Sequence, residues 1–225
     1  MPDQRAPVTA MPAAPEVGDL FLDGVLASHL DAAQRRRLAE ARVGIAGAGG
    51  LGSNCAVLLA RSGVIRLTIA DHDVVSLSNL NRQFYWPRHV GRPKVDALGE
   101  ILHGLNPAIR PDLRRERLSA ENVAAVFAGC SVVVEAVDDA RVKKELVEAL
   151  FRAGHVVVSA SGMAGWGGPP MTTRRIGSRL IVVGDLLSEV TPDRPALAPR
   201  VVMAAALEAD AVLCCILDGE CGESR

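Results

Sequence analysis

Short apolar runs alternate with longer amphipathic segments through the middle of this 225-residue chain. The apolar runs predict strands at 43–46, 66–70, 109–113, 131–136 and 155–160. The segments between them predict helices, one from Leu51 to about Gly63 and others at 94–105, 120–127 and 139–153. Strands that alternate with helices form a parallel sheet covered on both faces. The expected fold class is therefore α/β, with a Rossmann-like, doubly wound and mainly parallel sheet.

The N-terminal part of the chain does not follow this alternation. Residues 1–18 are rich in Pro and Ala without any period, and we expect them to be disordered. A helix is expected from about Leu26 to Ala41, with Asp31 as a candidate cap. We expect a single domain over residues 19–217, followed by a polar tail at 218–225.

The C-terminal third adds elements of another kind. Thr172–Ile176 and Arg179–Val183 are joined by Gly177-Ser178, which is typical of a tight turn. These two segments predict an antiparallel hairpin added at the edge of the sheet. The Pro-rich segment 191–199 predicts a loop, and the strongly apolar segment 201–217 predicts a C-terminal helix.

Composition restricts the function classes. Hydrophobic residues make up 49% of the chain, enough for a sizeable core. The net charge is −1, which argues against a general binder of nucleic acid or membrane surfaces. No apolar run approaches the ~20 residues of a membrane-spanning helix, and the N-terminus lacks the pattern of a secretion signal. We therefore expect a cytoplasmic protein with no nucleic-acid or membrane partner.

The five cysteines do not predict a metal or disulfide framework. Their number is odd and no C-x-x-C pair occurs, so we expect neither paired disulfides nor a structural zinc site. Cys55 and Cys130 are expected in the core. Cys214 and Cys215 adjoin near the end of the last helix, and Cys221 in the polar tail is the candidate free thiol.

A glycine turn follows the first strand of the core. Gly47, Gly49 and Gly52 have the G-x-G-x-x-G spacing and open the next helix. Gly47 would permit the turn, Gly49 the close approach of a phosphate, and Gly52 the packing of the helix on the strand. Free N–H groups at the helix N-terminus attract an anion. The strand before and the helix after favour a nucleotide site over a turn that binds nothing.

Asp71 ends the second strand, 24 positions after Gly47. A carboxylate at this place commonly accepts hydrogen bonds from a ribose, although a cap is the alternative. Asp73 is better suited to capping the following turn. The glycine turn and Asp71 would also serve an NAD-dependent oxidoreductase, which remains the alternative enzyme class.

The segment after the second strand helps to distinguish an ATP site from an NAD site. The run 78–83 supplies amide, guanidinium and carboxamide groups, among them Arg82. Lys94 follows Pro93, a residue favoured in a first helical turn, and would point back toward the same crevice. Two additional cations suit a triphosphate whose leaving pyrophosphate gathers charge. The sequence therefore favours ATP over NAD.

A pair of carboxylates follows the strand predicted at 131–136. A carboxylate at the carboxyl end of a strand, in a doubly wound crevice, can hold Mg²⁺ against phosphate oxygens. The alternative is a cap on the next helix. We assign Asp138 to the metal and Asp139 to the cap.

Five motifs, in this order, resemble those of the E1-like adenylyltransferases. They are G-A-G-G-L-G-S-N (47–54), D-H-D (71–73), S-x-S-N-L-N-R-Q (76–83), G-R-P-K (91–94) and V-D-D (137–139). Such enzymes use ATP to adenylylate the C-terminal glycine of ubiquitin-like sulfur carriers, with release of pyrophosphate. The resemblance runs from about residue 42 to residue 217.

The resemblance implies a role for each candidate residue. It assigns Asp71 to the ribose, Arg82 and Lys94 to the phosphates, and Asp138 to Mg²⁺; the last three are the implied catalytic residues. The remaining implied nucleotide contacts are Gly47, Gly49, Gly50, Gly52, Asn79 and Gln83.

Within the family, the chain most resembles the short form of ThiF, whose members adenylylate the carrier ThiS in thiamine biosynthesis. Besides the short length, the stretches 160–167, 183–185 and 197–201 carry this resemblance. The implied partner is a carrier ending in Gly-Gly. From the expected fold, and not from any motif, we expect its tail to pass the glycine-rich stretch 162–168. A molybdopterin-type carrier and a tRNA carboxylate are the alternative acceptors, and a homodimer is left open.

Overall fold

The computed structural model describes residues 24–219. The expectations for residues 1–18, for Cys221 and for most of the polar tail lie outside this range. Within it, one sheet has seven strands in the order β3-β2-β1-β4-β5-β7-β6. Their bounds are β1 Arg42–Ala46, β2 Arg66–Ala70, β3 Asp112–Arg114, β4 Val132–Glu135, β5 Val156–Ala160, β6 Thr172–Ile176 and β7 Leu180–Gly184. All neighbours are parallel except β6 and β7, so the predicted fold class is confirmed.

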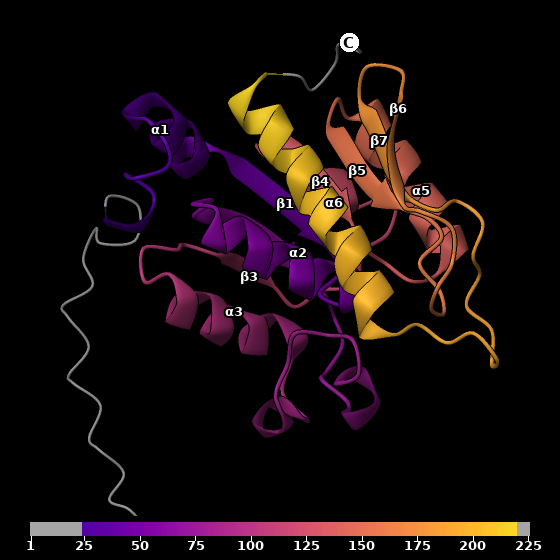
Figure 1. The fold of residues 1–225 in the computed structure, drawn as a ribbon. Coiled ribbons are helices and arrows are strands. Elements are labelled where there is room, and N and C mark those ends of the chain that lie inside the picture. The colour runs from indigo at the N-terminus through magenta and orange to yellow at the C-terminus, as the bar shows by residue number, and fades with distance from the viewer. Residues whose placement is uncertain (1–23, 220–225) are drawn as a thin grey trace, which may run out of the picture.

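Helices cover both faces of this sheet (Figure 1). They are α1 Ala32–Glu40, α2 Gly50–Arg61, α3 Lys94–Leu105, α4 Val123–Val126, α5 Ala140–Arg152 and α6 Ala198–Leu217. The long helix α6 crosses one face beside α2, with α3 on the far side of α2 (Figure 1). The helices α4 and α5 contribute to a second apolar cluster on the other face. Among the described helices, none is long and apolar enough to span a bilayer.

The central strands are buried on both faces, which explains their unbroken apolar runs. In β4, Val132 and Val134 join the cluster that contains α2 and α6, whereas Val133 joins the cluster with α4 and α5. The same alternation places Gly44 of β1 against Phe127, whose ring would lie 2.6 Å from a Cβ at that position. The core thus has two compartments separated by the sheet.

Several element boundaries differ from those predicted. The helix expected from Leu26 begins only at Ala32, because Asp31 and Gln34 form a capping box there; the cap itself is confirmed. The strand expected at 109–113 pairs over Asp112–Arg114, and Pro111 directly before it has no N–H to donate to a ladder.

Two helices also differ in length from the prediction. The one expected at 120–127 has only four residues, because the Asn122 side chain bonds to the backbone of Ser119 and Arg117 outside it. The C-terminal helix starts at Ala198, before the predicted Val201, since Pro199 is accommodated in a first turn. The hairpin of β6 and β7 is confirmed, with β6 at the sheet edge and β7 parallel to β5.

The sheet order places a crevice at its centre. Strand β1 pairs with β2 on one side and with β4 on the other, so the chain leaves β1 and β4 in opposite directions. Ligands of doubly wound sheets bind outside the carboxyl ends of the strands at such a switch point. Gly47 after β1 and Ala136 after β4 meet there, with Ala136 O 2.9 Å from a Cβ built on Gly47.

Candidate active site

A cavity of about 300 Å³ occupies this crevice, the lower end of the range for small-molecule sites. Most of the residues expected at the site line it. These are Gly47, Gly49, Gly50, Asp71, Arg82, Gln83, Lys94 and Asp138. Gly52 and Asn79 are not among the lining residues. The cavity also includes residues of the glycine-rich stretch, Gly162 and Met163.

The glycine turn has the conformation that its spacing predicts. Gly47 has a φ of +102°, a left-handed backbone that favours glycine. A Cβ on Gly52 would lie 1.8 Å from Gly47 O, so this glycine lets α2 pack directly on the turn. A Cβ on Gly49 would meet only Gln83 Nε2, at 3.8 Å, which leaves the cavity in front of Gly49 open. Gly52 therefore shapes the site without facing it.

Asp71 is fastened to the glycine turn. Its Oδ2 accepts a hydrogen bond from the N–H of Ala48 at 2.7 Å, and its Oδ1 accepts from the N–H of Asp73 at 2.8 Å. The residue is 9% exposed and lines the cavity. The carboxylate at the end of β2 is thereby held in one orientation beside the turn.

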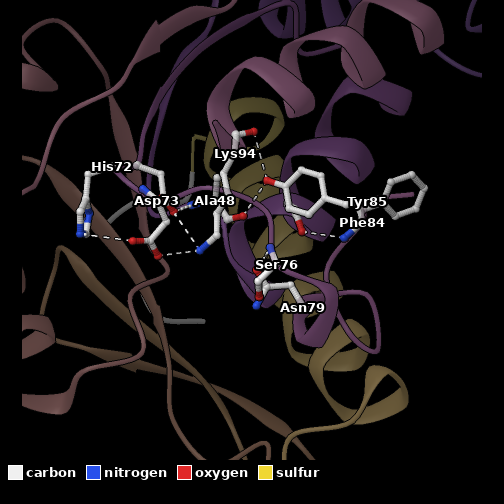
Figure 2. A network of polar contacts seen from close by, with 10 residues as sticks. Ala48, His72, Asp73, Ser76, Asn79, Phe84, Tyr85 and Lys94 are labelled. Atoms are coloured by element: carbon white, nitrogen blue, oxygen red, sulfur yellow. Dashed lines mark hydrogen bonds and ion pairs between the residues drawn. The ribbon is translucent and has the colours of Figure 1, made fainter. Parts of the chain in front are cut away.

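Lys94 reaches back from the first turn of α3 to this carboxylate. Its Nζ lies 2.8 Å from Asp73 Oδ2 and 3.9 Å from Asp71 Oδ2 (Figure 2). The hydrogen bond from Lys94 lowers the pKa of Asp73 below its usual value. Asp73 therefore pairs with the lysine, and the expectation that it caps the following turn is wrong.

Tyr85 supports the same corner, and sequence reasoning missed it. Its hydroxyl lies 2.8 Å from Ala48 O and 3.3 Å from Lys94 O (Figure 2). Burial, together with the charge of Asp71, raises the pKa of Tyr85, so the hydroxyl stays protonated and donates. This is the one tyrosine of the chain, and its position has no motif that could have revealed it.

Helix α2 holds the segment that carries Arg82 and Gln83. Asn54 Nδ2 donates to Arg82 O at 2.9 Å, and Ser53 Oγ accepts from the N–H of Phe84 at 2.9 Å. The Arg82 guanidinium is partly exposed and donates to Asn81 Oδ1 at 2.7 Å. Gln83 Oε1 is buried and has no hydrogen-bond partner among the described residues. A buried acceptor beside a cavity is available to a ligand that can donate to it.

Asn79 has a local task instead. Its Oδ1 accepts a hydrogen bond from the N–H of Ser76 at 3.0 Å, within a capping box of the 3₁₀ turn Leu77–Asn79 (Figure 2). The side chain thus shapes the loop that precedes Arg82. The expected direct contact between Asn79 and the nucleotide has no support in this arrangement.

The two carboxylates after β4 differ as expected in their contacts. Asp139 Oδ1 accepts from the N–H groups of Arg141 and Val142, both at 2.9 Å, and these bonds lower the pKa of the carboxyl. Its predicted role as the cap of α5 is confirmed. Asp138 lines the cavity, is exposed, and forms no hydrogen bond or ion pair within residues 24–219.

An uncommitted carboxylate fits a hard divalent cation, which prefers oxygen ligands. In the described chain, one group of three close metal-binding side chains exists, Asp71, His72 and Asp73. Two of its carboxylates already accept hydrogen bonds from the protein. Asp138 is therefore the residue better suited to Mg²⁺.

Two further cations line the cavity, Arg117 and Lys143, and both were missed in the sequence. Lys143, from the second turn of α5, lines the cavity and pairs with the fully buried Glu135 at 2.5 Å. Glu135 also accepts from Ser159 Oγ at 2.7 Å and from the N–H of Val137 at 2.9 Å. A glutamate directly after the apolar run 132–134 was the signal that a buried partner had to exist.

The cysteines expected in the core are there. Cys55 is fully buried and Cys130 is 7% exposed, and burial raises the pKa of both thiols. Cys215 is also buried and Cys214 is half-buried. Among the described residues no cysteine lines the cavity.

Known proteins share both this sequence and this fold. The sulfur carrier protein ThiS adenylyltransferase of Escherichia coli is 33% identical over 154 residues, which are 68% of this chain and 57% of that relative. The molybdopterin-synthase adenylyltransferase of Salmonella typhimurium is 35% identical over 127 residues, 56% of this chain and 51% of the relative. The chain therefore spans about half the length of these two curated relatives.

A solved structure with a similar fold is that of the E. coli tRNA N6-threonylcarbamoyladenosine dehydratase in complex with ATP. Its TM-score is 0.79 at 22% identity, over 90% of this chain and 97% of that one. A model described as the ThiF family matches residues 24–209, which is most of the sequence. With the glycine turn, the fixed Asp71 and the switch-point cavity, this match shows that the chain belongs to the ThiF family.

Proposed function

We propose that this chain uses ATP to adenylylate the C-terminal glycine carboxylate of a ubiquitin-like sulfur carrier protein. One observation carries the proposal above the others: a single cavity brings the glycine turn, Asp71, Arg82, Lys94 and Asp138 together. A dinucleotide-binding turn alone would not require the two cations or the uncommitted carboxylate. The ThiS and molybdopterin-synthase adenylyltransferases among its relatives support the same reaction class.

The nucleotide occupies one side of the cavity in this proposal. We name this side the nucleotide wall, formed by Gly47, Gly49, Gly50, Leu51, Asp71, Arg82, Gln83 and Lys94. Asp71 offers its carboxylate to the ribose, and the open space before Gly49 admits a phosphate close to the backbone. Arg82 and Lys94 neutralise phosphate charge.

The reaction forms one bond and breaks one. An oxygen of the glycine carboxylate attacks the α-phosphorus of ATP, and the bond from this phosphorus to the oxygen shared with the β-phosphorus breaks. Pyrophosphate leaves, and the carrier tail becomes an acyl adenylate. No general base is required, because a carboxylate is ionised at neutral pH. The protein contributes position and charge stabilisation.

Asp138, which lines the same cavity, would hold Mg²⁺. The bound cation would neutralise phosphate charge as the pyrophosphate leaves. Within this arrangement Asp138 positions charge, while Asp139 remains a helix cap.

The carrier that we propose is ThiS, in thiamine biosynthesis. The E. coli ThiS adenylyltransferase aligns over 68% of this chain, the molybdopterin-synthase adenylyltransferase over 56%. The stretches 160–167, 183–185 and 197–201 carry the resemblance to the short ThiF branch, and Gly162, Met163 and Val201 of these stretches line the cavity. A molybdopterin-type carrier is the second candidate.

Carrier-dependent exchange of labelled pyrophosphate into ATP tests the proposal. A ThiS-type carrier should support exchange, and a molybdopterin-type carrier should support less. Deleting the terminal glycine of the carrier, or replacing it with a bulky residue, should abolish exchange. Free glycine should not substitute, because it lacks the binding energy of the folded carrier.

Two results would contradict it. Exchange that is equally fast with free amino acids would indicate a small-molecule ligase. A thermal shift with NAD but none with ATP and Mg²⁺ would return the chain to the oxidoreductase alternative.

A further inference from the structure

Asp185 and Arg200 form a buried ion pair behind the cavity. Asp185 follows β7, and Arg200 lies in the first turn of α6. Arg200 Nη2 contacts Asp185 Oδ2, and their side chains are 6% and 0% exposed. Neither residue belongs to the nucleotide wall. Burial of two charges carries a desolvation penalty that can exceed their attraction, so stabilisation of the fold does not by itself explain this pair. Its role has to be found in the segments that it holds.

The pair organises the turn that follows β7. Asp185 Oδ1 accepts from the N–H groups of Leu187 and Ser188, both at 2.8 Å, and Ser188 Oγ donates to Asp185 Oδ2 at 2.7 Å. Burial raises the pKa of Asp185, but these bonds and the Arg200 guanidinium more than offset it and hold the pKa below its usual value. Leu186 has a φ of 61°, the one positive φ of a non-glycine residue in the described chain. The turn is thus held in a conformation that few residues adopt.

The same pair holds the glycine-rich stretch. Ser188 Oγ accepts from the N–H of Ala164 at 3.1 Å, which joins the two loops. A Cβ on Gly162 would lie 2.0 Å from Asp185 Oδ1, and one on Gly168 would lie 3.0 Å from the Arg200 guanidinium. The backbone of this stretch therefore passes so close to the pair that a side chain is excluded at Gly162, and one at Gly168 would displace the Arg200 guanidinium.

These loops and the start of α6 form the second side of the cavity. We name it the acceptor wall, formed by Gly162, Met163, Ser188, Val190, Ala196 and Val201. Val201, next to Arg200, also contacts the glycine turn, since its Cγ1 lies 2.9 Å from a Cβ built on Gly50. Arg200 thus connects the position of the acceptor wall to the nucleotide wall.

We propose that Asp185 and Arg200 are positioning residues that hold the acceptor wall in register with the nucleotide, so that an extended, side-chain-free peptide end can lie against it. The inference rests on the proposed function and specifies how its acceptor is selected. The wall presents glycine backbone, apolar side chains and the Ser188 side chain, with no charged group of its own. Such a surface suits a Gly-Gly tail better than a phosphate or a sugar.

The experiment compares Arg200→Met with Arg200→Lys in carrier-dependent pyrophosphate exchange, using a purified ubiquitin-like carrier that ends in Gly-Gly. Arg200→Met should raise the KM for the carrier about tenfold or more, the effect expected when a positioning contact is lost. The KM for ATP should change by less than about twofold, since the nucleotide wall is intact. Arg200→Lys keeps the charge but not the planar fork and should recover part of the carrier KM.

A matched control separates positioning from general loss of stability. Leu146→Ala removes a fully buried side chain in the other core compartment and should lower the melting temperature. It should leave the ratio of carrier KM to ATP KM unchanged. Where Arg200→Met fails to fold, Ser188→Ala tests the same relay, because it removes only the hydroxyl between Asp185 and Ala164.

The outcomes distinguish the inference from the proposed function. A wild-type protein without carrier-dependent exchange overturns both. If the wild type supports exchange but the carrier KM is unchanged in folded Arg200→Met and in Ser188→Ala, only the positioning role is overturned. A parallel rise of carrier KM and ATP KM also overturns it, since that result would mean general damage to the cavity.

Discussion

The nucleotide wall and the acceptor wall of one cavity use charged residues differently. On the nucleotide side Lys94 and Asp71 line the cavity, and the Asp138 carboxylate, which also lines it, has no partner in the described chain. On the acceptor side Asp185 and Arg200 pair with each other, and Asp185 also accepts hydrogen bonds from backbone N–H groups behind the wall. Charge that faces a cavity can act on a ligand, whereas charge enclosed behind it can only shape the surface. Predictions at Asp138, Arg82, Lys94 and Glu208 test this difference.

The largest effect is expected at Asp138. Asp138→Asn keeps the shape and removes the negative charge, so exchange should fall by about 10² or more, as when one charge-stabilising group is lost. The melting temperature should not change, because the carboxylate holds nothing else in the described structure. Asp139→Asn is the matched control, since Asn caps a helix as well as Asp does and activity should persist. Unaltered turnover in Asp138→Asn would remove this residue from the site.

A smaller effect is expected at the two cations of the nucleotide wall. Arg82→Ala should lower kcat/KM for ATP about 10- to 100-fold, the value of one charge-assisted hydrogen bond. Its melting temperature should stay close to wild type, since a partly exposed cation adds little stability. Lys94→Met should lower both activity and melting temperature, because it leaves Asp73 and the largely buried Asp71 without their ammonium partner.

Arg88→Ala provides the control for a cation outside the cavity and should change neither quantity. If Arg82→Ala unfolds the protein while the remaining folded fraction keeps normal kinetics, Arg82 is structural. Arg82 would then support the fold, as Arg200 does, and its charge would no longer distinguish the nucleotide wall from the acceptor wall.

A moderate effect on stability alone is expected at Glu208 of α6. Both carboxyl oxygens are buried without a partner among the described residues, unlike those of Asp185. Burial raises the pKa of Glu208 well above its usual value. A Glu side chain in the unfolded chain has a pKa of about 4.3. The free energy of unfolding therefore falls as the pH rises from this value toward the raised pKa of Glu208 in the folded state. Glu208→Met should therefore stabilise the protein near neutral pH by about 1–3 kcal/mol.

Urea unfolding across the pH range measures this gain, which should shrink toward pH values below the pKa of unfolded Glu. Glu189→Met, at an exposed position, is the control and should show no such pH dependence. A gain that is constant with pH would mean that folding leaves the pKa of Glu208 unshifted, and would contradict its burial without a partner.

The smallest effect is expected from the cysteines. A variant with Cys214, Cys215 and Cys221 changed to Ser should still exchange pyrophosphate at close to the wild-type rate, because carboxylate attack on ATP needs no thiol. Metal analysis of the purified protein should show less than stoichiometric zinc. Loss of exchange in this variant, with the fold intact, would support a covalent step on the protein.

Much of the nucleotide wall could be predicted from local sequence. The glycine spacing, the carboxylate after the second strand and the cations that follow are close in sequence, and each has a position fixed by its own strand end or helix start. The parts that could not be predicted depend on distant partners. Tyr85 reaches Ala48 across 37 positions, and Glu135 meets Ser159 across 24.

The sequence by itself determined the alternation of strands and helices, because apolar periodicity reflects burial directly. It also determined the glycine turn, since only glycine tolerates a backbone such as that of Gly47. The tertiary structure alone decided that Asp185 would meet Arg200 and that Gly162 would pass against them. Such pairs have no characteristic spacing in the sequence, because the sheet order and the path of α6 bring them together. No local segment of the sequence determines the sheet order or the path of α6.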